Sequence, residues 1–263
     1  MTRFAYHLEA PAGPALGLVV LEADATIEHD FRRILPASAR LHISRVPSAP
    51  DVTSETLQAM EAHLPAAAGL LPASVDFDTI GYGCTSGTAQ IGAGRIAELV
   101  RRGKPCRTVT EPLSALVAAC AALGLNRLAF LSPYVDPVSE RLRGALARAG
   151  IATPVFGTFA EQEEARVAQI APASTRAAGA TLVSQAGAGE VDALFLSCTN
   201  LRTLAVIDAL EAETGLPVLS SNQVLAWHMA RLADPGLALT GPGRLLQNVT
   251  GFAPPAGAAS AAL

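Results

Sequence analysis

Short runs of apolar residues alternate along this chain with longer stretches in which apolar residues recur at helical spacing. The short runs have the length of buried strands and lie at 17–22, 41–46, 79–84, 106–110, 127–132, 153–158, 193–198 and 217–221. The stretches between them favour helices at 26–34, 53–70, 86–102, 112–123, 136–149, 161–189, 200–214 and 222–233. Strict alternation of strand and helix predicts an α/β fold with parallel sheets and helices on both faces.

Glycines that end the predicted helices support this scheme, and 263 residues are enough for two lobes. Gly124 and Gly215 each close a predicted helix. No segment of linker-like composition divides the chain, so ordinary loops near 110–114 and 219–222 are expected to join the lobes. We assign residues 14–112 plus 220–250 to the first lobe and residues 113–219 to the second. Residues 1–13 and 253–263 show no periodicity and are expected to be loose tails.

Composition narrows the class of protein. Half of the 263 residues are hydrophobic and 16% are charged, which is enough for a large core. The net charge of −4 gives no reason to expect nucleic acid or an anionic membrane as partner. The first twenty residues lack a basic segment followed by a long apolar run, and no stretch reaches the roughly 18 apolar residues of a spanning helix. We therefore expect a cytoplasmic protein that does not contact a membrane.

The four cysteines are Cys84, Cys106, Cys120 and Cys198. Nothing marks the chain as secreted, so disulfides are not expected. C-x-x-C and Cys-His spacings are absent, so we expect no metal site. Cys106 and Cys120 are interpreted as packed, inert core thiols.

Cys84 and Cys198 differ because each ends a predicted strand. Residues 79–88 read T-I-G-Y-G-C-T-S-G-T, and residues 193–200 read A-L-F-L-S-C-T-N. In both, an apolar run stops at a Cys-Thr pair, which is typical of a buried parallel strand that delivers a side chain into a crevice. Two such segments suggest two similar halves that face each other, with a pair of thiols across one small ligand.

The residues after each cysteine suit an anionic group. The glycines of the first segment let the backbone bend and approach a ligand closely. The amides of Thr85 and Ser86 are expected at a helix N-terminus, where they favour a carboxylate and the thiolate form of Cys84. Thr199 and Asn200 offer a helix cap and donors to a second anionic group.

These two segments resemble the paired cysteine motifs of the aspartate/glutamate racemase superfamily, and specifically its maleate isomerase and arylmalonate decarboxylase branch. The resemblance runs through most of the chain and includes L-E-A-D-A-T-I-E, S-P-Y-V-D-P-V and S-S-N-Q-V-L-A-W-H. Within the branch the chain is most similar to an ectoine-utilisation subgroup. The resemblance implies two pseudo-symmetric flavodoxin-like lobes, an active site between them that needs no cofactor, and a homo-oligomer. It also implies catalysis by Cys84 and Cys198, with Tyr134 hydrogen-bonding the substrate.

Two features separate this chain from members of that branch. Decarboxylases of the branch carry glycine at the first cysteine position, so the presence of both cysteines argues against simple decarboxylation. Maleate isomerases carry Asn where this chain has Asp24, which as an anion would repel a dicarboxylate and suit an ammonium or amide group. An acidic run at 161–164 falls near a second substrate-contacting Asn of the maleate enzymes, although a solvated first turn of a helix is the favoured interpretation there.

The leading hypothesis is a cofactor-independent isomerase or racemase that acts on a small carboxylic acid, with an amino-acid derivative as the best fit. A maleate cis-trans isomerase is the first alternative, an arylmalonate-type decarboxylase the second, and a non-enzymatic sensor of small acids the third. The predicted catalytic residues are Cys84 and Cys198, and the predicted substrate-binding residues are Asp24, Thr85, Ser86, Tyr134, Thr199 and Asn200.

Overall fold

Eight strands form the frame of the protein, as the apolar runs predict. The computed structural model describes residues 1–248. Its strands are β1 (Ala15–Leu21), β2 (Arg40–Val46), β3 (Phe77–Gly83), β4 (Cys106–Thr110), β5 (Arg127–Tyr134), β6 (Ala152–Glu161), β7 (Ala193–Leu196) and β8 (Val218–Ser220). Each overlaps a predicted strand, so the strand prediction is confirmed.

The strands form two parallel four-stranded sheets of the same topology. The first has the order β2-β1-β3-β4 and the second β6-β5-β7-β8, so each strand of the first sheet has a counterpart four strands later in the chain. In the first sheet β2 lies on one side of β1 and β3 on the other, and in the second sheet β6 and β7 flank β5 in the same way. Each sheet therefore has a topological switch point, at β1 and β3 in the first sheet and at β5 and β7 in the second. Open α/β sheets bind their ligands at the carboxyl ends of the strands beside such a point.

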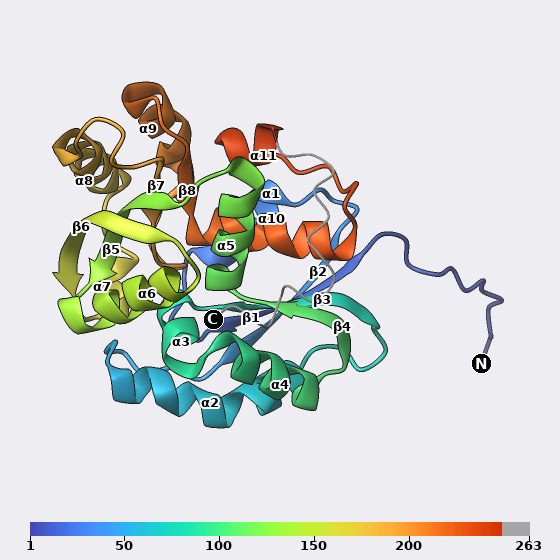
Figure 1. The fold of residues 1–263 in the computed structure, drawn as a ribbon. Helices are drawn as coiled ribbons and strands as arrows, with labels where there is room; N and C mark the ends of the chain where they lie inside the picture. Colours follow the sequence, from blue (N-terminus) through green and yellow to red (C-terminus); the bar gives the residue numbers. More distant parts are fainter. Residues whose placement is uncertain (249–263) are drawn as a thin grey trace.

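Helices cover the sheets. They are α1 (Ile27–Ile34), α2 (Ser54–Gly69), α3 (Thr85–Ile91), α4 (Ala93–Gly103), α5 (Pro112–Leu123), α6 (Asp136–Arg148), α7 (Glu164–Val167), α8 (Pro172–Gln185), the 3₁₀ turn η1 (Leu204–Val206), α9 (Ile207–Thr214), α10 (Ser221–Ala233) and α11 (Arg244–Asn248). Figure 1 shows α2 and α4 on one face of the first sheet and α10 on the other. Although α10 follows β8 in the chain, it packs on β1, β3 and β4 of the first sheet.

Three predicted helices are divided in the structure. The predicted helix 86–102 breaks at Gly92, whose φ of +93° is a conformation that favours glycine. The predicted helix 161–189 begins later, because β6 extends to Glu161, and it is divided into α7 and α8, the second of which starts at Pro172. The predicted helix 200–214 starts only at Leu204. Helix α11 was not predicted.

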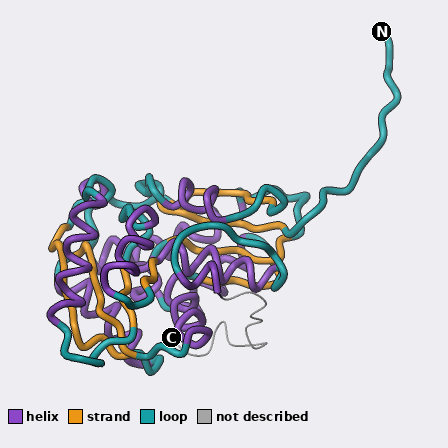
Figure 2. The backbone as a smooth tube through the Cα atoms, turned by 90° about the horizontal axis from the view of Figure 1, so that it is seen from above, coloured by secondary structure: helices purple, strands orange, loops and turns teal. Residues whose placement is uncertain are grey.

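The two sheets share their hydrophobic cores. One buried cluster joins Leu18 of β1 and Trp227 of α10 to Phe130 and Phe195 of the second sheet. The other joins the end of β3 to Tyr134 at the end of β5. The lobe boundaries drawn from the sequence remain a prediction. Residues 1–13 extend away from the body without regular structure (Figure 2), and the C-terminal segment 253–263 lies outside the described residues.

Candidate active site

Four of the predicted site residues lie where the strands beside the two switch points end. Asp24 follows β1, Cys84 follows β3, Tyr134 closes β5, and Cys198 follows β7. All four side chains are at most 4% exposed. The equivalent ends of two similar sheets thus place two thiols, a carboxyl and a phenol in one buried region.

Cys84 is the N-cap of α3. Its sulfur accepts a hydrogen bond from the Gly87 amide at 3.2 Å and lies 3.6 Å from the Ser86 hydroxyl. A Cβ on Gly87 would lie 2.5 Å from the Tyr82 hydroxyl and 3.0 Å from this sulfur, so only glycine fits here. The need for glycine is thus steric: φ of Gly87 is not positive, contrary to the expectation that the glycines supply unusual backbone bends.

The protonation of Cys84 differs from the expectation. Burial raises the pKa of this thiol to about 12, against the lowering effects of the Ser86 hydroxyl and the Gly87 amide. The field of a short helix does not compensate the loss of solvent. The resting Cys84 is therefore a neutral thiol, and the expectation of a thiolate is wrong.

Cys198 has a strained backbone. Its φ is +105°, a region that L-residues rarely adopt and that costs about 1–3 kcal/mol. The sulfur accepts a hydrogen bond from the Asn200 amide at 3.2 Å and lies 2.9 Å from the Tyr134 hydroxyl oxygen. Burial, followed by the charge of Glu164, raises the pKa of the Cys198 thiol well above its usual value. No helix begins at Thr199 or Asn200, so the predicted cap does not form.

Hydrogen bonds join the two cysteine-bearing loops directly. The Thr199 hydroxyl donates to the Gly83 carbonyl oxygen at 3.3 Å. The Ser221 hydroxyl oxygen accepts from the Thr85 hydroxyl at 2.9 Å and from the Cys198 amide at 3.0 Å. Ser221 is the first residue of α10, so this helix holds the ends of β3 and β7 together.

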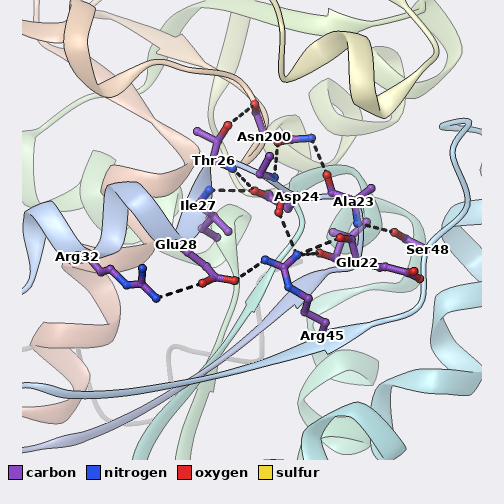
Figure 3. A network of polar contacts seen from close by, with 12 residues as sticks. Glu22, Ala23, Asp24, Thr26, Ile27, Glu28, Arg32, Arg45, Ser48 and Asn200 are labelled. Atoms are coloured by element: carbon purple, nitrogen blue, oxygen red, sulfur yellow. Dashed lines mark hydrogen bonds and ion pairs between the residues drawn. The ribbon is translucent and has the colours of Figure 1, made fainter.

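Asp24 caps α1 from the loop after β1 (Figure 3). Its Oδ1 accepts hydrogen bonds from the amides of Thr26 at 2.8 Å and Ile27 at 2.9 Å. Its Oδ2 is buried and accepts no hydrogen bond of normal geometry. Burial raises the pKa of Asp24, while the two amides and the nearby Thr199 hydroxyl lower it. The loop itself is held by Arg45, which donates to the carbonyl oxygen of Asp24 at 3.0 Å.

Asn200 connects the loop after β1 to the second sheet. Its Oδ1 accepts from the Ala25 amide at 2.9 Å, and its carbonyl oxygen accepts from the Thr26 hydroxyl at 2.9 Å (Figure 3). Its Nδ2 lies 3.3 Å from both the carbonyl oxygen and Oε1 of Glu164. The side chain is therefore already bonded within the protein, and its predicted contact with a substrate carboxylate remains a prediction. The same holds for Thr85 and Thr199, whose hydroxyls join the loops.

Glu164 is a site residue that the sequence interpretation missed. Instead of lying in a solvated turn, it is 4% exposed. Its Oε2 accepts a hydrogen bond from the Tyr134 hydroxyl at 2.9 Å. Burial raises the pKa of Glu164 to about 7; the charge of Asp24 acts in the same direction, whereas Tyr134 and Asn200 lower the pKa. In the sequence, nothing distinguishes this acid from Glu161 and Glu163.

A cleft opens beside these groups. It is narrow, with a cavity volume of about 10 Å³, and Cys84, Ser86, Tyr134 and Glu164 are among its lining residues. Cys198 lies next to it through its contact with Tyr134. At the rim of the cleft, the segments 50–52 and 162–164 are joined by two backbone hydrogen bonds. The Val52 amide donates to the carbonyl oxygen of Gln162 and the Glu164 amide to that of Pro50, both at 2.9 Å.

Among residues 1–248, no helix is long and apolar enough to cross a membrane. Within the same residues, no group of three or more His, Cys, Asp or Glu side chains could hold a metal ion.

Comparison with known proteins gives a consistent family. The chain is 28% identical over 244 residues to a maleate isomerase of Nocardia farcinica, covering 88% of this chain and 95% of that protein. It is also 28% identical over 253 residues to an arylmalonate decarboxylase of Bordetella bronchiseptica, covering 90% and 98% of the two chains.

Solved structures share the fold. A variant of the Nocardia farcinica maleate cis-trans isomerase with a covalently bound succinylcysteine intermediate superposes with a TM-score of 0.77 at 26% identity, over 89% of this chain and 98% of that one. The maleate isomerase Iso of Pseudomonas putida gives 0.78 at 24% identity, over 90% and 99%. A family model described as arylmalonate decarboxylase matches residues 88–246, which is more than half of the chain. The chain therefore belongs to the arylmalonate decarboxylase family.

Proposed function

We propose that this protein is a cofactor-independent isomerase or racemase that uses Cys84 and Cys198 on a small carboxylic acid carrying an amino group. The observation that carries the proposal is the placement of the two thiols. Each follows the third strand of its sheet. Their loops are held together by the hydrogen bond that Thr199 donates to Gly83 and by those that Ser221 accepts from Thr85 and Cys198.

Two thiols on either side of a carbon atom permit two related reactions. In a racemisation, one sulfur removes the α-proton and the opposite thiol delivers a proton to the other face. In a cis-trans isomerisation, one thiolate adds to an activated double bond, the new single bond rotates, and elimination releases the trans product. Both require donors that stabilise the negative charge developing on the substrate carboxylate, and Ser86 on the cleft wall is the predicted residue for this role.

The charges of the site favour a substrate with an ammonium group. Asp24 has a buried oxygen that accepts no hydrogen bond of normal geometry, and Glu164 lines the cleft. A dicarboxylate would meet like charges there in a partly desolvated space, whereas an ammonium group would supply both donors and a compensating charge. The maleate isomerases that the chain resembles carry Asn at the position of Asp24. We therefore expect the residue at this position to give the protein a different substrate preference.

Maleate cis-trans isomerisation is the second candidate. The relatives named maleate isomerase support it, as does the covalent succinylcysteine of one of them, because a thiol adduct is the intermediate that such a mechanism requires. An arylmalonate-type decarboxylase and a catalytically silent sensor of small acids are the remaining candidates.

Hydrogen exchange with solvent separates these functions. The purified protein is incubated in D₂O with a panel of α-amino acids, their N-acyl derivatives, maleate and arylmalonates. A racemase labels the α-carbon and scrambles its configuration, an isomerase forms fumarate from maleate, and a decarboxylase releases CO₂. Binding without any conversion would contradict the proposal and favour the sensor.

A further inference from the structure

We propose that Glu164 is the proton acceptor of the Cys198 thiol, reached through the Tyr134 hydroxyl. The inference rests on the proposed function, since it explains how a buried neutral thiol becomes the base or nucleophile that the function needs. It adds a role for a residue outside the cysteine pair.

The hydrogen bonds run in one direction. The Tyr134 hydroxyl donates its single proton to Glu164 Oε2 at 2.9 Å, so it can only accept at its contact with Cys198, whose sulfur lies 2.9 Å from the same oxygen. The order is therefore S–H of Cys198 to the oxygen of Tyr134, and O–H of Tyr134 to Glu164. This order is the one needed to move a proton from sulfur to carboxylate.

The transfer itself is balanced. The S–H bond of Cys198 breaks as a new O–H bond forms on Tyr134, and the original O–H bond of Tyr134 breaks as a new one forms on Glu164. The result is a thiolate, an unchanged neutral phenol and a neutral carboxylic acid. No oxidant or further reactant takes part.

Electrostatics favours this route over loss of the proton to solvent. If Glu164 keeps its charge while Cys198 ionises, two negative charges lie in one desolvated cluster, and the carboxylate charge is among the causes that raise the pKa of the Cys198 thiol. Transfer along the hydrogen bonds from Cys198 through Tyr134 to Glu164 keeps the total charge of these three side chains at −1. The thiolate then also retains the hydrogen bond from the Asn200 amide at 3.2 Å.

The groups that face Glu164 come from four other segments. Tyr134 approaches from β5, Asn200 and Cys198 from the loop after β7, Asp24 from the loop after β1, and Cys84 from the end of β3. Asp24 raises the pKa of Glu164, while Tyr134 and Asn200 lower it. On its own segment the neighbouring acid Glu163 is exposed. The carboxyl group of Glu164 is thus the one in the acidic run that is placed to exchange protons with the site.

The test measures the pH dependence of Cys198 alkylation and needs no substrate. In a Cys84→Ser background, iodoacetamide labels Cys198 between about pH 5 and pH 10, and the peptide carrying Cys198 is quantified by mass spectrometry. The coupled thiol and carboxyl hold two protons at low pH and share one after the first is lost, so the rate should rise through about pH 7 and level off before a second rise, when the shared proton is lost. Adding Glu164→Gln keeps the size and an acceptor oxygen but removes the proton site.

In the Glu164→Gln variant the step near pH 7 should disappear, and the labelling rate at about pH 8 should fall about tenfold, which corresponds to one pKa unit. The Glu163→Gln variant, one residue away and exposed, should keep the step. Glu164→Gln and parent proteins with the same profile, or a parent without the step, would overturn the proposal. Because no turnover is measured, failure of the D₂O screen and failure of this inference remain distinguishable.

Discussion

The Thr199 hydroxyl donates a hydrogen bond to the carbonyl oxygen of Gly83 at 3.3 Å. Gly83 precedes Cys84 and Thr199 follows Cys198, so this bond ties together the two loops that carry the thiols. The Ser221 hydroxyl adds a second tie between the same loops. The site is therefore built by direct contact between the ends of two sheets.

Removing the second tie should destabilise the protein. Ser221→Ala leaves the buried Cys198 amide and the Thr85 hydroxyl without their acceptor, and an unsatisfied buried donor costs about 1–3 kcal/mol. Urea unfolding should show a loss of this size. Ser174→Ala, at an exposed position of α8, should change stability by no more than about 0.5 kcal/mol. Equal effects of the two changes would show that Ser221 does not hold the loops.

The strain at Cys198 predicts an unusual order of stability. Because φ is +105°, Cys198→Gly should be more stable than Cys198→Ala by about 1 kcal/mol. Cys120 provides the matched control, since it is equally buried but lies within α5, where glycine should be less stable than alanine by about 0.5–1 kcal/mol. Thermal unfolding of the four variants tests this. The same order at both positions would argue against strain at Cys198.

Glu164 should make the protein less stable as the pH rises. The pKa of Glu164 is about 7 in the folded protein against its ordinary value of 4.5, so the folded state binds the proton more tightly. Its contribution is most favourable below about pH 4.5 and is lost as the pH rises through 7. Glu164→Gln should therefore stabilise the protein more at about pH 8 than at about pH 5, by up to about 3 kcal/mol. Urea unfolding of wild type and variant at both pH values measures the difference, and a pH-independent difference would contradict the shifted pKa.

Asp24→Asn should shift binding toward dicarboxylates. Asn keeps an oxygen that can accept from the Thr26 and Ile27 amides, so the cap of α1 is retained. Removing one like charge near a bound dianion is worth about 1–4 kcal/mol at close range, which predicts maleate binding at least about fivefold tighter. Calorimetric titration measures it. Asp51→Asn at the exposed rim of the cleft is the control and should have a smaller effect; unchanged or weaker binding by Asp24→Asn would contradict the role of its charge.

The parts of the fold that depend on local pattern were predictable from the sequence. Fully buried strands such as β1 and β7 are nearly uninterrupted apolar runs, and edge strands such as β2 and β4 could be placed by their position between helical segments. Helix breaks were harder, because Gly92 sits in an otherwise helical pattern and its positive φ becomes visible only in the folded chain.

The site was predictable to the extent that its residues end strands. Cys84 and Cys198 could be found in this way, whereas Tyr134 was predicted from the resemblance to the family. Glu164 could not, because its burial depends on the placement of α7 against the ends of β5 and β7, and three acids of one short run look alike in the sequence. The neutral state of Cys84 was also out of reach, since the depth of burial outweighs the local helix field that the sequence suggests.

The central claim is that both thiols act on one substrate carbon, and hydrogen exchange in single cysteine variants tests it most directly. Cys84→Ser, Cys198→Ser and the control Cys106→Ser are incubated in D₂O with the best substrate of the screen, and conversion is followed by NMR. We expect both site variants to lose at least about 10²-fold in rate with the fold intact, and the control to keep wild-type activity. Wild-type conversion by either Cys84→Ser or Cys198→Ser would contradict the paired-thiol mechanism.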